Sequence, residues 1–187
     1  MIGDEKKTIE LGEDGFFTFE MDANTDYYFF ASKADYLNNN SRFSTKGIAK
    51  DPANPIQKFE VEILLDKIFK NREIVLENIY YDYDESYIRQ DAQPTLNKLA
   101  ELLQRNPDIK IELASHTDCR GPAGYNQKLS QERAQAAVDF LIKKGIQSER
   151  VSARGYGKNS PAIDCICQRC TDEERQINRR TAFKVLD

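Results

Sequence analysis

The spacing of apolar residues changes near residue 72, and this change limits the folds open to the chain. Before it, apolar residues alternate or run together over short stretches, as in β-strands. After it, stretches with the period of a strand alternate with stretches with the period of a helix. This order predicts an α+β protein whose larger domain has a mixed sheet with helices on one face. At 187 residues, the chain is long enough for this domain and a smaller one, and we place them at residues 71–187 and 1–70.

The first domain is predicted to be all-β. Its expected strands are residues 8–11, 16–21, 26–31 and 59–65. Residues 37–57 are rich in Asn, Ser and Pro, which favour turns, and are expected to form a connection.

The second domain is predicted to contain strands at residues 73–82, 109–113, 151–156 and 178–185. Asp91 is expected to cap a first helix that ends at Asn106, before a proline. A second helix covers residues 126–144 and ends at Gly145. Its expected core stripe is Ala134, Val138, Leu141 and Ile142.

The charge and the hydropathy of the sequence argue against several classes of function. The 27 Lys and Arg residues against 31 Asp and Glu residues give a net charge of −4, which argues against nucleic acid as a partner. No apolar stretch approaches the roughly 18 residues of a transmembrane helix. The first residues contain neither an apolar signal core nor a lipobox cysteine. We therefore expect a cytosolic protein, or one whose signal, membrane anchor and further modules lie upstream.

A carboxylate and a guanidinium stand out near the second helix. Asp118 follows a predicted strand and precedes a Gly/Pro loop, a common place for ligand binding in α/β sheets. Asn126, Leu129 and Arg133 share one face of the helix by their spacing. Asp118 and Arg133 could form a structural salt bridge, or a clamp that binds the ammonium and the carboxylate of a zwitterion.

Catalysis is not expected. His116 is the single histidine, and we expect it to be a hydrogen-bonded structural residue. It cannot form a triad with Ser115 and Asp118, because neighbouring side chains on a strand point to opposite faces. The sequence has no HExxH motif, no second histidine and no activated Cys–His pair by spacing, and we expect no cofactor.

Four cysteines, of which three lie close together, indicate disulfides, a metal site or free thiols. They are Cys119, Cys165, Cys167 and Cys170. The spacing of the last three is poor for zinc, even with His116 nearby.

Three runs of residues carry a resemblance to a known family: SHTDCRGPAGYNQKLSQERAQAAVDFLIKKGI, ARGYGKNSP and NRRTAFKV. With NIYYDYDESYIRQDA before them, they resemble the OmpA C-terminal-like peptidoglycan-binding family over residues 72–187. The resemblance implies an OmpA-like α/β sandwich that binds the diaminopimelate-containing stem peptide of peptidoglycan. It also implies a non-catalytic periplasmic anchor of an outer-membrane lipoprotein or assembly, without a cofactor.

The same resemblance implies which residues bind the ligand. Asp118 and Arg133 match the positions that hold diaminopimelate, and the other matches are Tyr83, Asp84, Asn126, Leu129 and Arg179. Each of four has a plainer alternative. Tyr83 could pack on the first helix, Asn126 could cap the second, Leu129 could pack within it, and Arg179 could face solvent.

Relatives in this family also carry a cysteine-closed loop before the last helix, which implies two disulfides here. Of the three possible pairings, we expect Cys165–Cys170 with Cys119–Cys167, because bridges between adjacent cysteines are strained. The second bridge would brace the loop of Asp118.

The sequence EDGFFTFEMDANTDYYFFASKADY resembles carboxypeptidase-regulatory-like domains, which implies a truncated immunoglobulin-like β-module. This order of modules resembles envelope lipoproteins of Bacteroidetes, including a peptidoglycan-anchoring component of the type IX secretion system. Other envelope or secretion-complex proteins are then expected partners. The alternative is a protein-interaction module with little affinity for peptidoglycan.

Overall fold

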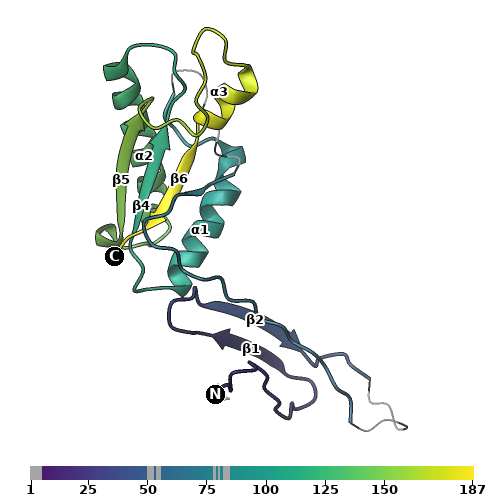
Figure 1. Ribbon diagram of the computed structural model, residues 1–187. Helices are drawn as coiled ribbons and strands as arrows, with labels where there is room; N and C mark the ends of the chain where they lie inside the picture. The colour runs from purple at the N-terminus through teal and green to yellow at the C-terminus, as the bar shows by residue number, and fades with distance from the viewer. Residues whose placement is uncertain (1–5, 50–52, 54–55, 78, 80, 82–84) are drawn as a thin grey trace. The chain divides into compact units, whose positions relative to one another are not determined.

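The computed structural model describes residues 6–49, 53, 56–77, 79, 81 and 85–187 (Figure 1). The chain divides into two compact units, one within Met1–Phe30 and Asn40–Ile63, the other within Ala31–Asn39 and Leu64–Asp187. Asn38 belongs to the second unit, where its backbone N–H donates to Asn106 Oδ1 over 2.7 Å. The two domains predicted from the sequence stay a prediction, because compactness alone does not establish independent folding.

The strands β1 (Asp26–Ala31) and β2 (Asn39–Ser44) form a two-stranded sheet. All of its residues except Ala31 and Asn39 belong to the first unit. β1 coincides with a predicted strand, whereas β2 lies in the stretch predicted as a connection, so that prediction was wrong. Contacts between the strands explain the difference. Arg42 pairs with Asp26 at 3.2 Å and its guanidinium lies 5.3 Å from the Tyr28 ring centre. These contacts outweigh the turn preference of the Asn and Ser residues.

The other stretches predicted as strands, residues 8–11, 16–21 and 59–65, form no strand in the described part of the first half. Their aromatic side chains pack without backbone pairing. The Phe19 ring lies 5.5 Å from that of Tyr27, and the Phe59 ring lies 5.0 Å from that of Phe43. In these stretches, the alternation of apolar residues therefore reflects the packing of aromatic side chains and not the pairing of strands. The immunoglobulin-like module stays a prediction.

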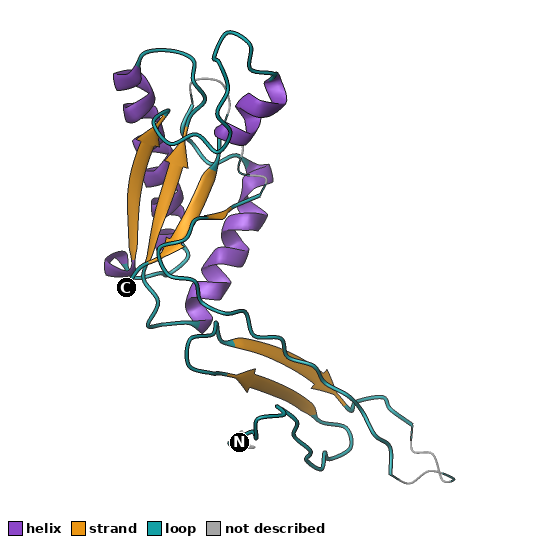
Figure 2. Ribbon diagram, in the orientation of Figure 1, coloured by secondary structure: helices purple, strands orange, loops and turns teal. Residues whose placement is uncertain are grey.

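The second unit contains a four-stranded sheet in the order β3-β6-β4-β5 (Figure 2). The strands are β3 (Ile74–Val75), β4 (Ile111–His116), β5 (Val151–Gly157) and β6 (Thr181–Val185). β4 runs parallel to β5 and antiparallel to β6, and β3 is antiparallel to β6. The predicted mixed sheet is confirmed.

Among the residues that the structure describes, three α-helices accompany the sheet: α1 (Gln93–Arg105), α2 (Ala123–Lys143) and α3 (Asp172–Asn178). Two short 3₁₀ helices, η1 (Gln90–Ala92) and η2 (Ser148–Arg150), precede α1 and β5. One buried cluster joins α1 and α2 to a single face of the sheet, as predicted. Its members include Leu96, Leu99, Leu103, Ile111, Leu113, Val138, Leu141, Phe183 and Val185.

Several predicted boundaries need correction. Asp91 does not cap α1, because it lies within η1 and binds Arg89 at 2.8 Å. The strand predicted at residues 73–82 is limited, within the described residues, to Ile74–Val75. The last strand begins at Thr181 rather than residue 178, because Asn178 is the last residue of α3. Reciprocal capping bonds between Thr171 and Glu174 fix the start of that helix.

The second helix begins at Ala123 rather than residue 126, and Gly145 follows it with a φ of 90°, as expected for a residue that ends a helix. Ile142 is 39% exposed and was wrongly placed in the core. The buried stripe of α2 runs through Ala134, Ala137, Val138 and Leu141. Ile142 lies one position beyond this face.

Arg150 ties α1 to the sheet. Its guanidinium is buried and donates to the carbonyls of Leu103 at 2.9 Å, Asn106 at 2.6 Å and Ile109 at 3.1 Å. Carbonyls at a helix C-terminus lack partners within the helix, and a cation there is favourable. One side chain therefore satisfies the end of α1 and fixes the turn into β4.

Side chains of α2 form hydrogen bonds with backbone groups of β5, the strand at one edge of the sheet. Gln131 accepts from Gly155 N at 2.8 Å and donates to Ala153 O at 3.2 Å. Ser130 Oγ accepts from Gly157 N at 2.8 Å. This approach requires glycine at 155, because a Cβ there would lie 2.3 Å from Gln131 N. The arrangement also protects an edge strand from pairing with another chain.

We predict that Gly155→Ala lowers the free energy of unfolding by about 3 kcal/mol or more, since α2 and β5 would have to separate. Gly124→Ala is the control, because a Cβ at that helical position meets nothing within 4 Å. It should be neutral or stabilising by up to about 1 kcal/mol. Urea unfolding followed by circular dichroism measures both. Equal midpoints for Gly155→Ala and the parent protein would contradict the close packing.

Candidate functional site

β4 ends and β6 begins at the same end of the sheet, near α3 (Figure 1). Several polar side chains at this end are buried. Ser115 Oγ lies 2.9 Å from Thr181 Oγ1, which joins the two strands there. Thr117 and Asp118 continue from β4 and are also buried. Since a soluble domain rarely buries polar groups without a partner, this end of the sheet is the candidate site.

Asp118 is the centre of this group. Its side chain is 8% exposed and pairs with Arg179 Nη1 at 2.6 Å and with Arg120 Nη2 at 2.9 Å. Its Oδ1 also accepts from the backbone N–H of Arg120 at 2.9 Å. Within the described residues, the ion-pair partners of Asp118 are thus Arg120 and Arg179, not the Arg133 of the predicted salt bridge.

These contacts change the acidity of Asp118. Burial by itself would raise the pKa of its carboxyl group, but the hydrogen bonds from Arg120 and Arg179 outweigh burial and lower the pKa below its ordinary value. Asp118 is therefore a carboxylate at neutral pH.

Arg133 is buried on α2. Its Nε donates to Glu85 O at 3.0 Å, and its guanidinium lies 4.6 Å from the ring centre of Tyr81. The Tyr81 hydroxyl is 3.4 Å from both Arg133 O and Thr181 Oγ1. Tyr81 therefore connects Arg133 to the strand end that carries Asp118. Burial raises the pKa of Tyr81, so its hydroxyl stays protonated.

The other expected ligand residues differ in their placement. Asn126 is buried in the first turn of α2, and its amide donates to Arg120 O at 2.7 Å, so it holds the loop rather than capping the helix. Leu129 is half-buried on α2. Arg179, at the end of α3, faces Asp118 and also donates to Gln176 Oε1 at 2.7 Å. Tyr83 and Asp84 lie outside the described residues.

Two side-chain hydrogen bonds and a disulfide hold the loop after Asp118 in place. Lys158 Nζ donates to Gly121 O at 2.8 Å, and Asn126 holds the carbonyl of Arg120. The disulfide Cys119–Cys167 ties the loop to the segment before α3. Arg120, Tyr81 and Lys158 were not predicted from the sequence. Arg120 could have been suspected from its place in the loop, two residues after Asp118.

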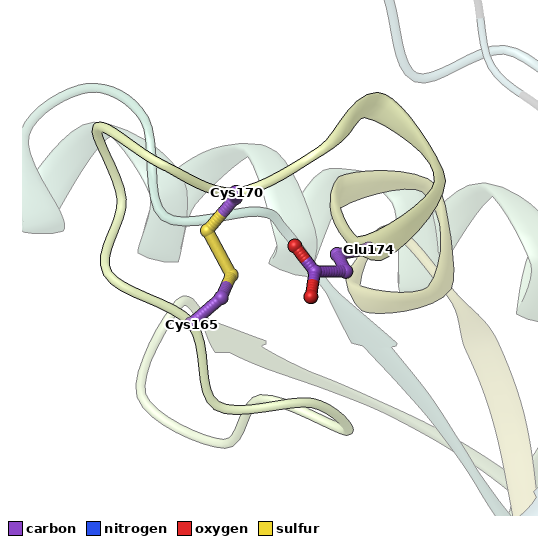
Figure 3. A group of neighbouring side chains, drawn as sticks. All are labelled: Cys165, Cys170 and Glu174. Atoms are coloured by element: carbon purple, nitrogen blue, oxygen red, sulfur yellow. A yellow bond between two sulfur atoms is a disulfide. The ribbon is translucent and has the colours of Figure 1, made fainter.

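The second disulfide is Cys165–Cys170, so both bridges have the predicted pairing. Glu174 lies beside this bridge (Figure 3), and its carboxylate accepts from Thr171 N at 2.8 Å. The two sulfurs and this carboxylate lie within 4.8 Å of one another. They are nevertheless a poor metal site, because sulfurs joined in a disulfide are not thiolates.

His116 lies on the sheet face opposite the helices. Its ring stacks on Tyr156 with centres 5.0 Å apart, and Nε2 is 3.4 Å from Glu73 Oε1. Burial and the nearby Arg180 lower the pKa of His116 to about 4, so the ring is neutral at pH 7. Glu73 is the polar neighbour of this ring, although neither ring nitrogen forms a hydrogen bond of good geometry among the described residues. Ser115 faces Thr181 instead, so no triad forms.

The sequence model of the OmpA family matches residues 80–179, more than half of the chain. The chain belongs to the OmpA family. The peptidoglycan-associated lipoprotein of Brucella melitensis is 40% identical over 100 residues, which cover 54% of this chain and 60% of that protein. This chain covers between 13% and 60% of the length of the curated relatives that it matches.

Solved structures agree with this assignment. The peptidoglycan-associated lipoprotein from Burkholderia pseudomallei superposes with a TM-score of 0.52 at 27% identity, covering 57% of this chain and 87% of that one. The cell wall anchor of the type VI secretion system from Pseudomonas aeruginosa has a TM-score of 0.51 at 28% identity, covering 61% and 78%. The described helices of this OmpA-family chain include none long and apolar enough to cross a membrane.

Protonation of Asp118 should destabilise the fold. Because its pKa is lower in the folded chain than in the unfolded one, its stabilisation is complete above about pH 5 and is lost as the pH falls through the folded pKa. We predict that Asp118→Asn lowers the free energy of unfolding at pH 7 and that this deficit shrinks between pH 5 and the acid limit of folding. Urea unfolding at several pH values measures the deficit.

Asp139→Asn is the control for this titration, since Asp139 is an exposed carboxylate on α2. Its effect should be small at every pH. A deficit of Asp118→Asn that is independent of pH would contradict the charged pairing.

The two disulfides should differ in their contribution to stability. In the chain-entropy account, a bridge across 48 residues contributes about 4 kcal/mol and one across 5 residues about 2 kcal/mol. We therefore predict a larger loss of unfolding free energy for Cys119→Ala/Cys167→Ala than for Cys165→Ala/Cys170→Ala. Denaturant unfolding without reductant tests this order, and the reverse order would contradict it.

Proposed function

We propose that this chain binds the diaminopimelate-containing stem peptide of peptidoglycan without covalent chemistry, and thereby anchors an envelope protein to the cell wall. The observation that carries the proposal is the pair of buried opposite charges, Asp118 and Arg133, at one end of an OmpA-family sheet. The names of the relatives from Brucella and Burkholderia support the ligand class. Two disulfides suit an oxidising compartment, which supports a periplasmic location at the outer membrane.

In this proposal the two charges have different tasks. The carboxylate of Asp118 accepts hydrogen bonds from the free ammonium of diaminopimelate. The guanidinium of Arg133, with its planar set of donors, binds the neighbouring carboxylate. Tyr81 lies 4.6 Å from this guanidinium and keeps it in place. Tyr83, Asp84, Asn126, Leu129 and Arg179 complete the proposed binding set.

The role is that of a binding module, not an enzyme. Ser115 Oγ contacts Thr181 Oγ1, while His116 stacks on Tyr156 across the sheet. Relatives named as a lipoprotein and as a cell wall anchor support this role.

A finer assignment rests on the order of the two modules. We propose that the chain belongs to an envelope lipoprotein of the Bacteroidetes type, resembling the C-terminal part of PorE of the type IX secretion system. Proteins of that complex would be its partners, and any membrane attachment would come from upstream segments.

Calorimetric titration with a tripeptide that ends in meso-diaminopimelate tests the binding. The lysine-containing tripeptide, which lacks the second carboxylate, should bind far more weakly. We predict that Asp118→Asn and Arg133→Gln each weaken binding of the first peptide by about 10- to 100-fold, since each removes one charge-assisted hydrogen-bonding partner.

Glu132→Gln is the matched control, because Glu132 is an exposed residue beside Arg133 whose ion pair is with Lys128 at 3.8 Å. It should bind like the parent chain. Parent-like affinity in both site variants would refute the clamp. An absence of heat with either peptide, in a folded and oxidised sample, would favour the protein-interaction alternative.

A further inference from the structure

Asp118 is covered by a side chain of its own loop. Its carboxylate is 8% exposed, whereas the side chain of Arg120 is 57% exposed and lies over it. Arg120 Nη2 is 2.9 Å from Oδ2, and Nε lies 3.4 Å and 3.3 Å from Oδ1 and Oδ2. A ligand ammonium needs these carboxylate oxygens, so it cannot reach them while Arg120 stays in place.

The two arginines on Asp118 are held differently. Arg179 is 30% exposed, donates to Gln176 Oε1 at 2.7 Å and follows α3 directly. Arg120 is nearly twice as exposed. Its backbone is fixed by the bond from its N–H to Asp118 Oδ1 and by the bond from Asn126 to its carbonyl. Arg120 can therefore withdraw its guanidinium by side-chain rotation alone, without moving the loop.

We infer that Arg120 is an internal competitor for the ammonium site and sets the affinity of the clamp. Its guanidinium occupies Asp118 in the empty protein and leaves when a primary ammonium arrives. This inference rests on the proposed function and adds the residue that controls access to it. Arg179 stays on Asp118 in both states and keeps the carboxylate charged.

The physics of this exchange is favourable. The exchange replaces one cation on Asp118 by another, so the buried carboxylate is never left without a partner. The side chain of Arg120 is 57% exposed, so its guanidinium is solvated by water when it leaves. The apparent dissociation constant equals the intrinsic one divided by the fraction of molecules in which Arg120 has withdrawn. If that fraction is about one tenth, removal of the guanidinium tightens binding about tenfold.

The test is Arg120→Met, which keeps the aliphatic stem and the backbone N–H but removes the competing charge. We expect the diaminopimelate tripeptide to bind about tenfold more tightly in calorimetry. Arg154→Met is the control for a general loss of positive charge, since Arg154 is 63% exposed on β5 and pairs with Glu112 at 3.8 Å. It should leave the affinity unchanged.

A second peptide isolates the ammonium. When the free amine of diaminopimelate is acetylated, no cation competes with Arg120, and the tightening by Arg120→Met should disappear. Weaker binding by Arg120→Met, or equal tightening with the acetylated peptide, would overturn the inference while the parent protein still binds. Failure of both the parent and Arg120→Met to bind the free-amine peptide would overturn the proposed function, and the inference with it.

Discussion

A charged carboxylate removed from water is the constraint on which the second unit depends. Burial of Asp118 would cost several kcal/mol if it had no partners, so the chain must bring cations to it. Arg120 comes from the same loop, and Arg179 comes from the end of α3. The residues between them in sequence include all of α2 and β5. One charge therefore joins segments that secondary structure alone would leave apart.

The backbone around this charge is fixed by different kinds of contact. The disulfide Cys119–Cys167 holds the loop to the segment before α3, and Lys158 and Asn126 satisfy its carbonyl groups. A loop held in this way loses little further entropy when a ligand binds. The backbone of this loop is rigid, whereas the side chain of Arg120 is exposed. We therefore assign the exchange of cations on Asp118 to a movement of this side chain.

The sheet supports the site from the other side. α2 fits against β5 because glycine at 155 allows helix and strand to meet, and Gln131 closes the strand edge. The same helix carries Arg133 near its middle. The position of Arg133 therefore follows from the packing of α2 on β5, and a loosened contact at Gly155 would also shift the guanidinium.

The sequence by itself determined the layered fold, the second helix and most of its buried stripe, because period and end signals depend on neighbouring residues. It also pointed to Asp118 and Arg133, since their motifs are local. It misjudged β2, whose Asn and Ser residues favour turns, because the cross-strand pair of Asp26 and Arg42 forms only in the folded chain.

Only the tertiary structure decided which partners these residues have. That Asp118 pairs with Arg120 and Arg179, and that Arg150 satisfies the end of α1, depends on groups far apart in sequence or on the rotamer of a loop side chain. Such pairings are set by the cost of burying unpaired charges and carbonyls, which arises only when the chain is compact. No spacing in the sequence encodes that cost.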